Sequence, residues 1–163
     1  MKNDVPNVHS ANALCVRISP NAGCWHQIVV MLTCAENPII ASGGADKRIA
    51  LIDGNTGDIM QWIDAAHSGA VLSLDFHPTQ PYIPYRIVSS YASRLLLSSS
   101  MDRSHKIFDI ESGEAVQVFH DHAKYVTRVR WHSSGDMFAS SSYDHTVCIY
   151  TYVITVSLCG CSA

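Results

Sequence analysis

The sequence predicts an all-β protein built from about three four-stranded antiparallel units. Two repeated patterns support this prediction, one that begins at three histidines and one that surrounds three aspartates. In both patterns short apolar stretches alternate with polar positions and end in turns, which is typical of strands with one buried face. No stretch of the chain shows the 3.6-residue periodicity of an amphipathic helix.

The first pattern begins at His9, His67 and His122. Apolar residues follow each histidine after seven and nine positions, and a turn residue follows after eleven. In order along the chain these residues are Val16, Ile18 and Pro20; Leu74, Phe76 and Pro78; and Val129, Trp131 and Ser133. Each stretch therefore reads as a half-buried strand that ends at a turn.

The second pattern surrounds Asp46, Asp102 and Asp144. A serine stands four residues before each aspartate (Ser42, Ser98, Ser140), and an apolar or aromatic residue stands six residues after it (Ile52, Phe108, Tyr150). The first two units continue through the glycine-containing turns DGNTGD and DIESGE into the segments IMQWI and AVQVF. Each unit thus reads as strand, turn, strand, aspartate turn, strand, glycine turn, strand.

This spacing resembles the WD-repeat β-propeller family from about Val8 to Tyr150. The family's Gly-His and Trp-Asp dipeptides are absent, so the resemblance depends on spacing. It implies propeller blades made of four-stranded antiparallel meanders. Because known propellers have about four to eight blades, three blades imply an incomplete ring.

The predicted organisation is one WD-repeat domain over residues 1–163. Its parts are blade one at 8–66 with an insertion at 21–36, blade two at 67–121 with an insertion at 79–93, an incomplete blade three at 122–152 and an atypical tail at 153–163. The insertions can be read as variable loops, as a shared binding lip or, together with the tail, as translated intron or gene-model sequence.

The recurring His, Ser and Asp invite a comparison with a catalytic triad. A triad needs one activated serine, whereas here the same residue types recur once per unit and no G-x-S-x-G turn is present. The structural interpretation is therefore favoured. The resemblance implies three hydrogen-bonded sets: His9, Ser42 and Asp46; His67, Ser98 and Asp102; and His122, Ser140 and Asp144. It also implies a further hydrogen-bond donor six residues after each aspartate. Ile52 and Phe108 cannot donate from this position, and only Tyr150 of the third unit can.

The predicted function is that of a non-catalytic scaffold for protein–protein interaction within a larger complex. Side chains beside the aspartate turns are the candidate partner-binding residues, although packing or simple solvation explains them equally well: Met101, Tyr143, Lys124 and Tyr125. The alternatives are a truncated splice or gene-model product without independent function, and a propeller enzyme, for which no unique cluster of acidic or metal-binding residues is found. The open edges of the predicted blades also suggest self-association.

The remaining expectations concern cofactors, partners and location. The formal net charge of −3 and the absence of a basic patch argue against nucleic-acid or membrane partners. Two close pairs, His120 with His122 and Cys159 with Cys161, lack the spacing of zinc ligands, so no metal or other cofactor is expected. A polar N-terminus and six scattered cysteines favour an intracellular protein of the cytoplasm or nucleus.

Overall fold

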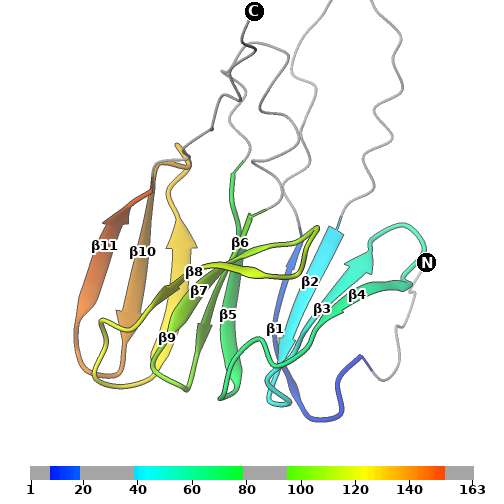
Figure 1. Cartoon of the computed structure of the whole chain (residues 1–163), viewed down its shortest axis with the longest axis horizontal. Coiled ribbons are helices and arrows are strands. Elements are labelled where there is room, and N and C mark those ends of the chain that lie inside the picture. Colours follow the sequence, from blue (N-terminus) through cyan, green and yellow to red (C-terminus); the bar gives the residue numbers. More distant parts are fainter. Residues whose placement is uncertain (1–7, 19–38, 79–94, 153–163) are drawn as a thin grey trace, which may run out of the picture.

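The computed structural model describes residues 8–18, 39–78 and 95–152. These residues form eleven strands and no helix, which confirms the predicted all-β fold. The strands build three antiparallel sheets that lie side by side (Figure 1). Within the described ranges, no helix is long and apolar enough to cross a membrane.

Each sheet follows the chain in simple order. The first sheet contains β1 (Ala13–Ile18), β2 (Ile39–Gly44), β3 (Ile49–Asp53) and β4 (Ile59–Ile63). The second contains β5 (Val71–Phe76), β6 (Leu95–Ser100), β7 (His105–Asp109) and β8 (Ala115–Phe119). The third contains β9 (Val126–Trp131), β10 (Met137–Ser142) and β11 (Val147–Thr151).

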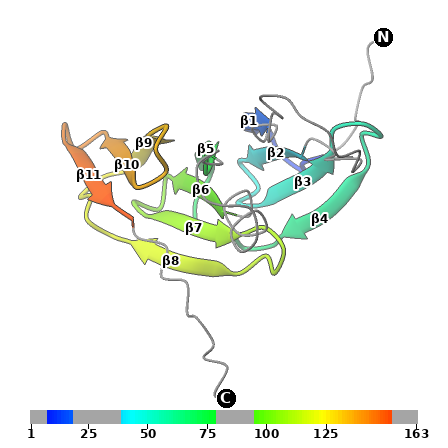
Figure 2. The same ribbon diagram turned by 90° about the horizontal axis from the view of Figure 1, so that it is seen from above.

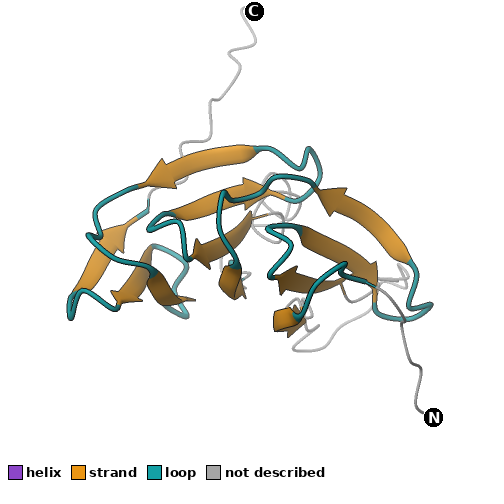
Figure 3. Ribbon diagram, turned by 90° about the horizontal axis from the view of Figure 1, so that it is seen from below, coloured by secondary structure: helices purple, strands orange, loops and turns teal. Residues whose placement is uncertain are grey.

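The three sheets form an arch. Figure 2 shows β1, β5 and β9 along its inner side and β4 and β8 along its outer side, and Figure 3 shows the same arch from below. The arch is not closed into a ring by the described residues. The predicted insertions at 21–36 and 79–93 and the tail at 153–163 lie outside the described residues, and the predicted domain divisions stay a prediction.

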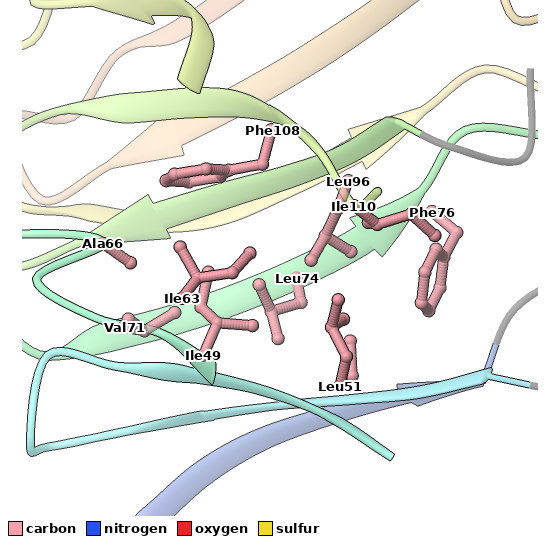
Figure 4. Close-up of a cluster of buried hydrophobic side chains, with 11 residues drawn as sticks. Ile49, Leu51, Ile63, Ala66, Val71, Leu74, Phe76, Leu96, Phe108 and Ile110 are labelled. Carbon is pink, nitrogen blue, oxygen red and sulfur yellow. The ribbon is translucent and has the colours of Figure 1, made fainter. Parts of the chain in front are cut away.

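The first junction, between the first and second sheets, is a continuous apolar core (Figure 4). The first sheet contributes Ile49, Leu51 and Ile63, and the second contributes Leu74 and Phe76, all of them buried. Burying one such side chain contributes about 1.5–3 kcal/mol. This core therefore accounts for the side-by-side packing of the two sheets.

The second junction joins the second and third sheets in the same manner. Leu97 and Ile107 of the second sheet pack against Val129, Trp131 and Phe138 of the third, and Phe119 and Tyr150 pack at the margin of this core. One face of the second sheet thus packs on the first sheet, and its other face packs on the third.

Backbone geometry explains the turns between the second and third strands of each sheet. Lys47, Arg103 and His145 have positive φ angles of 69°, 72° and 71°. The preceding aspartate stabilises this unfavourable conformation, because its side chain accepts a hydrogen bond from the amide two residues on, as at Ser104 (2.9 Å). We call these three segments, 45–48, 101–104 and 143–146, the Asp turns.

Candidate functional site

The Asp turns lie at one end of the sheets, along the lower edge of the view in Figure 1. Each of the three pattern histidines is hydrogen-bonded to the aspartate of one Asp turn. At this end the structure brings together all three of the His, Ser and Asp sets named above. In the second sheet, His67 Nδ1 lies 3.0 Å from Asp102 Oδ2, and His67 Nε2 lies 2.7 Å from Ser98 Oγ. The histidine therefore links the loop before β5 to both β6 and its Asp turn.

The hydrogen bonds fix the tautomer of His67. Burial lowers the pKa of His67 below its usual value, although Asp102 acts in the opposite direction, so the ring is neutral at pH 7. A neutral ring that faces a carboxylate donates its Nδ1–H to Asp102 and accepts a hydrogen bond from the Ser98 hydroxyl at Nε2.

Asp102 is ionised. Burial alone raises the pKa of its carboxyl group, but hydrogen bonds from His67 and Ser104 outweigh that effect and hold the pKa far below the usual range. The Ser68 amide also donates to this carboxylate, at 2.9 Å. A partly buried carboxylate that accepts hydrogen bonds from His67, Ser68 and Ser104 ties the loop at 67–68 to the Asp turn.

The other two sets have the same connectivity. In the first sheet, His9 lies 2.9 Å from Asp46 Oδ1 through Nδ1 and 3.1 Å from Ser42 Oγ through Nε2. In the third sheet, the corresponding distances are 3.0 Å from His122 to Asp144 and 2.8 Å from His122 to Ser140.

A hydroxyl group two residues after the aspartate belongs to two of these sets and was not predicted. Ser104 Oγ donates to Asp102 Oδ1 at 2.6 Å and lies 3.1 Å from His67 Nδ1. Thr146 Oγ1 occupies the same place beside Asp144 and His122, and its hydrogen bond is the first cause of the lowered pKa of Asp144. The first sheet has Arg48 at this position, so its set lacks the hydroxyl.

The Asp–His–Ser connectivity equals that of a catalytic triad, but the environment does not suit catalysis. A nucleophilic serine must reach its substrate. Ser98 is fully buried, and Ser140 is 1% exposed. The connectivity at these serines therefore supplies structural hydrogen bonds inside the sheets.

Among the three equivalent residues Ile52, Phe108 and Tyr150, only Tyr150 has a polar side-chain group. Its hydroxyl donates to Asp121 at 3.0 Å. Burial raises the pKa of this phenol well above its usual value. The hydroxyl thereby ties β11 to the loop that carries His122.

Three of the four predicted partner-binding residues form one surface cluster. The rings of Tyr125 and Tyr143 stack with centroids 4.8 Å apart, and Lys124 Nζ lies 5.4 Å from the Tyr143 ring centroid. The backbone holds them in place, because the Tyr143 amide donates to the Tyr125 carbonyl at 3.1 Å. Tyr143 remains 54% exposed. We call these three residues the tyrosine cluster.

Met101, the fourth predicted residue, lies in the Asp turn of the neighbouring sheet. Its amide donates to the Ala70 carbonyl at 3.0 Å, and its side chain is exposed. The tyrosine cluster and Met101 thus present apolar and aromatic side chains on a backbone that hydrogen bonds hold rigid.

His105 is a buried titratable residue that the sequence patterns did not single out. Its ring stacks on Phe119 with centroids 4.7 Å apart and also contacts Phe138 and Tyr150. Neither ring nitrogen has a hydrogen-bond partner among the described residues. Burial, followed by the nearby His122, lowers the pKa of His105 to about 4.

The described residues contain no group of three or more His, Cys, Asp or Glu side chains that could hold a metal ion. Cys15 and Cys148 are free. Cys15 Sγ lies 3.8 Å from the Gly43 carbonyl oxygen and 3.7 Å from the Val71 carbonyl oxygen, and burial raises the pKa of this thiol to about 11. A thiol with so high a pKa is a packing group and a poor nucleophile.

Comparison with known proteins gives consistent results. The family described as "WD domain, G-beta repeat" matches residues 61–109 and 113–151, which together make up more than half of the chain. Pre-mRNA-processing factor 19 of Mus musculus is 32% identical over 105 residues, which cover 64% of this chain and 18% of that protein. WD repeat-containing protein 1 of Xenopus tropicalis is 32% identical over 114 residues, 69% of this chain and 14% of that protein. Protein tipD of Dictyostelium discoideum is 27% identical over 115 residues, 68% of this chain and 17% of that protein. The chain spans less than a fifth of the length of each of these relatives.

Proposed function

Because the chain belongs to the WD40 repeat family, we propose that it is a non-catalytic scaffold that docks other proteins within a larger complex. The docking surface is the face that carries the Asp turns, and its anchor is the tyrosine cluster with Met101. The observation that carries this proposal is the stack of the partly buried Tyr125 on the exposed Tyr143, beside Lys124.

The physical basis is the low entropic cost of binding to such a surface. Aromatic and methionine side chains supply large contact areas, and residues of this kind dominate the binding energy of many interfaces. The stack and the Tyr143 amide bond restrict both rings before a partner arrives, so that little freedom is lost on binding.

A capture experiment tests the proposal. Tagged wild-type chain is compared with a Tyr143→Ser/Lys124→Ser variant and with a control variant, Val116→Ser, which changes an exposed apolar residue of β8 away from the Asp turns. Proteins captured from a cell lysate are quantified by mass spectrometry, and circular dichroism verifies that all three chains fold. The proposal expects partners that the wild type and the control capture and the double variant loses. Equal capture by all three chains refutes the proposed surface.

A second candidate is that the chain is a splice or gene-model product of a longer WD-repeat protein and does not act alone. The segments 21–36, 79–93 and 153–163, which depart from the repeat spacing, are the reason for considering this alternative. Sequencing of the transcript distinguishes the two: contiguous coding reads across 21–36, 79–93 and 153–163 refute the alternative, and intron boundaries at these segments support it.

An intracellular location, in the cytoplasm or nucleus, is part of the proposal. The two free thiols of the described residues, Cys15 and Cys148, support it, because reduced cysteines are typical of those compartments.

A further inference from the structure

The outer face of the first sheet, which points away from the second sheet, is apolar, and no other sheet of the described residues packs on it. Val16 and Ile18 of β1 are 57% and 63% exposed. Leu74 and Phe76 occupy the same pattern positions in the second sheet and are 1% and 5% exposed, because they pack on the preceding sheet. We call the surface formed by Val16, Ile18 and Ile40 the first free face.

The outer face of the third sheet shows the same contrast at the other end of the arch. Val147 and Ile149 of β11 are 68% and 75% exposed. The residues at their positions in the first sheet, Ile49 and Leu51, are almost completely buried against the second sheet. We call the surface formed by Val147 and Ile149 the second free face.

The two free faces are the two halves of a junction that the chain already contains. In the first junction, Ile49 and Leu51 pack against Leu74, Phe76 and their neighbours. Val147 and Ile149 are equivalent to Ile49 and Leu51 on one side of this contact. Val16 and Ile18 are equivalent to Leu74 and Phe76 on the other side. The first free face also contains a hollow of about 570 Å³ that Val16, Ile40 and Ile52 line together with the His9 loop.

We propose that two copies of the chain associate head to tail, with the second free face of each copy packed on the first free face of the other. Val147 and Ile149 of one copy then enter the hollow beside Val16 and Ile40 of the other. Such a contact joins two different surfaces and generates a ring when the rotation closes. Two arches of three sheets give six sheets, a number within the range of known propellers. Closure covers the first and second free faces of both copies.

Charge on the inner strands gives the association a distinctive salt dependence. Within one copy, Asp75 of β5 lies between two arginines, 3.5 Å from Arg17 Nε and 3.0 Å from Arg130 Nη1. At the new junction, Arg130 of one copy comes next to Arg17 of the other, with no carboxylate at the intervening position. Salt screens this repulsion and leaves the apolar contact intact. Association therefore strengthens as the salt concentration rises.

Sedimentation of the full chain tests the proposal with one variant for each face. The wild type is expected to sediment as a species of twice 17.9 kDa, and more completely at high salt. Ile18→Asp on the first free face and Ile149→Asp on the second each weaken association by at least about tenfold, because each buries a charge at the junction. Val118→Asp, at an exposed position of β8 outside both faces, serves as the matched control and leaves association unchanged.

Mixing the two variants tests the head-to-tail arrangement. A mixed pair can join the intact second face of Ile18→Asp to the intact first face of Ile149→Asp, so the mixture is expected to contain more dimer than either variant alone. Thermal melting of each variant shows that its fold is retained. A wild type that stays monomeric at all concentrations and salt levels overturns the proposal. So does an Ile18→Asp variant that still forms dimers, which indicates pairing of like faces, or a loss of association in Val118→Asp.

Discussion

The first and second sheets differ at two adjacent positions where the third strand begins. The first sheet has Arg48 and Ile49, and the second has Ser104 and His105. Ser104 completes a hydrogen-bonded set, whereas Arg48 turns outward, donating to Asp64 and lying over the Trp62 ring. Ile49 fills an apolar junction, whereas His105 brings into such a junction two ring nitrogens without a hydrogen-bond partner among the described residues.

Two adjacent positions of the same backbone thus affect different parts of the structure, one the polar set and the other the apolar core. Adjacent residues at a strand point to opposite faces, so position 48 or 104 affects the set and position 49 or 105 affects the junction. The second sheet therefore has the polar set with more hydrogen bonds, and it also has the core whose polar residue lowers the stability of the fold. Separate substitutions can measure each effect.

The largest expected effect is the loss of the Asp102 carboxylate. Asp102→Ala removes the acceptor of the Ser68 and Ser104 amides, the Ser104 hydroxyl and His67, and it should lower the free energy of unfolding by about 3 kcal/mol. Asp46→Ala, in the set without the hydroxyl, should cost about half as much. Urea unfolding followed by circular dichroism measures both. Equal losses at the two positions contradict the claim that the hydroxyl strengthens the second set.

The next effect depends on pH and concerns His105. Its pKa is lowered from 6.5 to about 4 in the folded chain, so between these values the unfolded chain binds a proton that the folded chain does not. His105 thus destabilises the fold increasingly as the pH falls below 6.5. His105→Ile, which places the residue found at Ile49 here, should remove this loss. Its advantage over the wild type in the free energy of unfolding should be about 2 kcal/mol larger at pH 5 than at pH 8. Urea unfolding at the two pH values tests it, and a gain that does not depend on pH contradicts the assignment.

The smallest effect isolates the unpredicted hydroxyl. Ser104→Ala should cost about 1 kcal/mol, because it removes one buried hydroxyl that bonds both Asp102 and His67. Thermal unfolding in the calorimeter measures it, with Ser112→Ala in the exposed glycine turn of the same sheet as the control. A neutral Ser104→Ala would show that the hydroxyl only occupies space.

Much of the fold followed from the sequence because three copies of each pattern had to agree. The segments IMQWI and AVQVF coincide with β4 and β8. The segments RIALI, SHKIF and TVCIY, which the sequence predicts as third strands, begin and end within one residue of β3, β7 and β11. A half-buried strand shows an alternation of apolar and polar residues in its own sequence, so such strands can be predicted without knowledge of distant contacts.

The parts of the site that were missed depend on contacts between segments or on only some of the repeats. Ser104 and Thr146 share a position, but Arg48 occupies it in the first unit, so a search for features common to all three units passes over it. His105 reads as a polar residue at the start of a strand. Only the packing of Phe119 and Phe138 around it shows that the ring is buried.

The central claim is that each histidine and its aspartate act as one bonded unit that holds a sheet together. A double-mutant cycle of His67→Ala and Asp102→Asn, read as free energies of unfolding, tests this most directly. We predict a coupling energy of about 1.5 kcal/mol for this pair and a smaller one for His9 and Asp46 in the parallel cycle. Additive losses at His67 and Asp102, with coupling near zero, would contradict the claim.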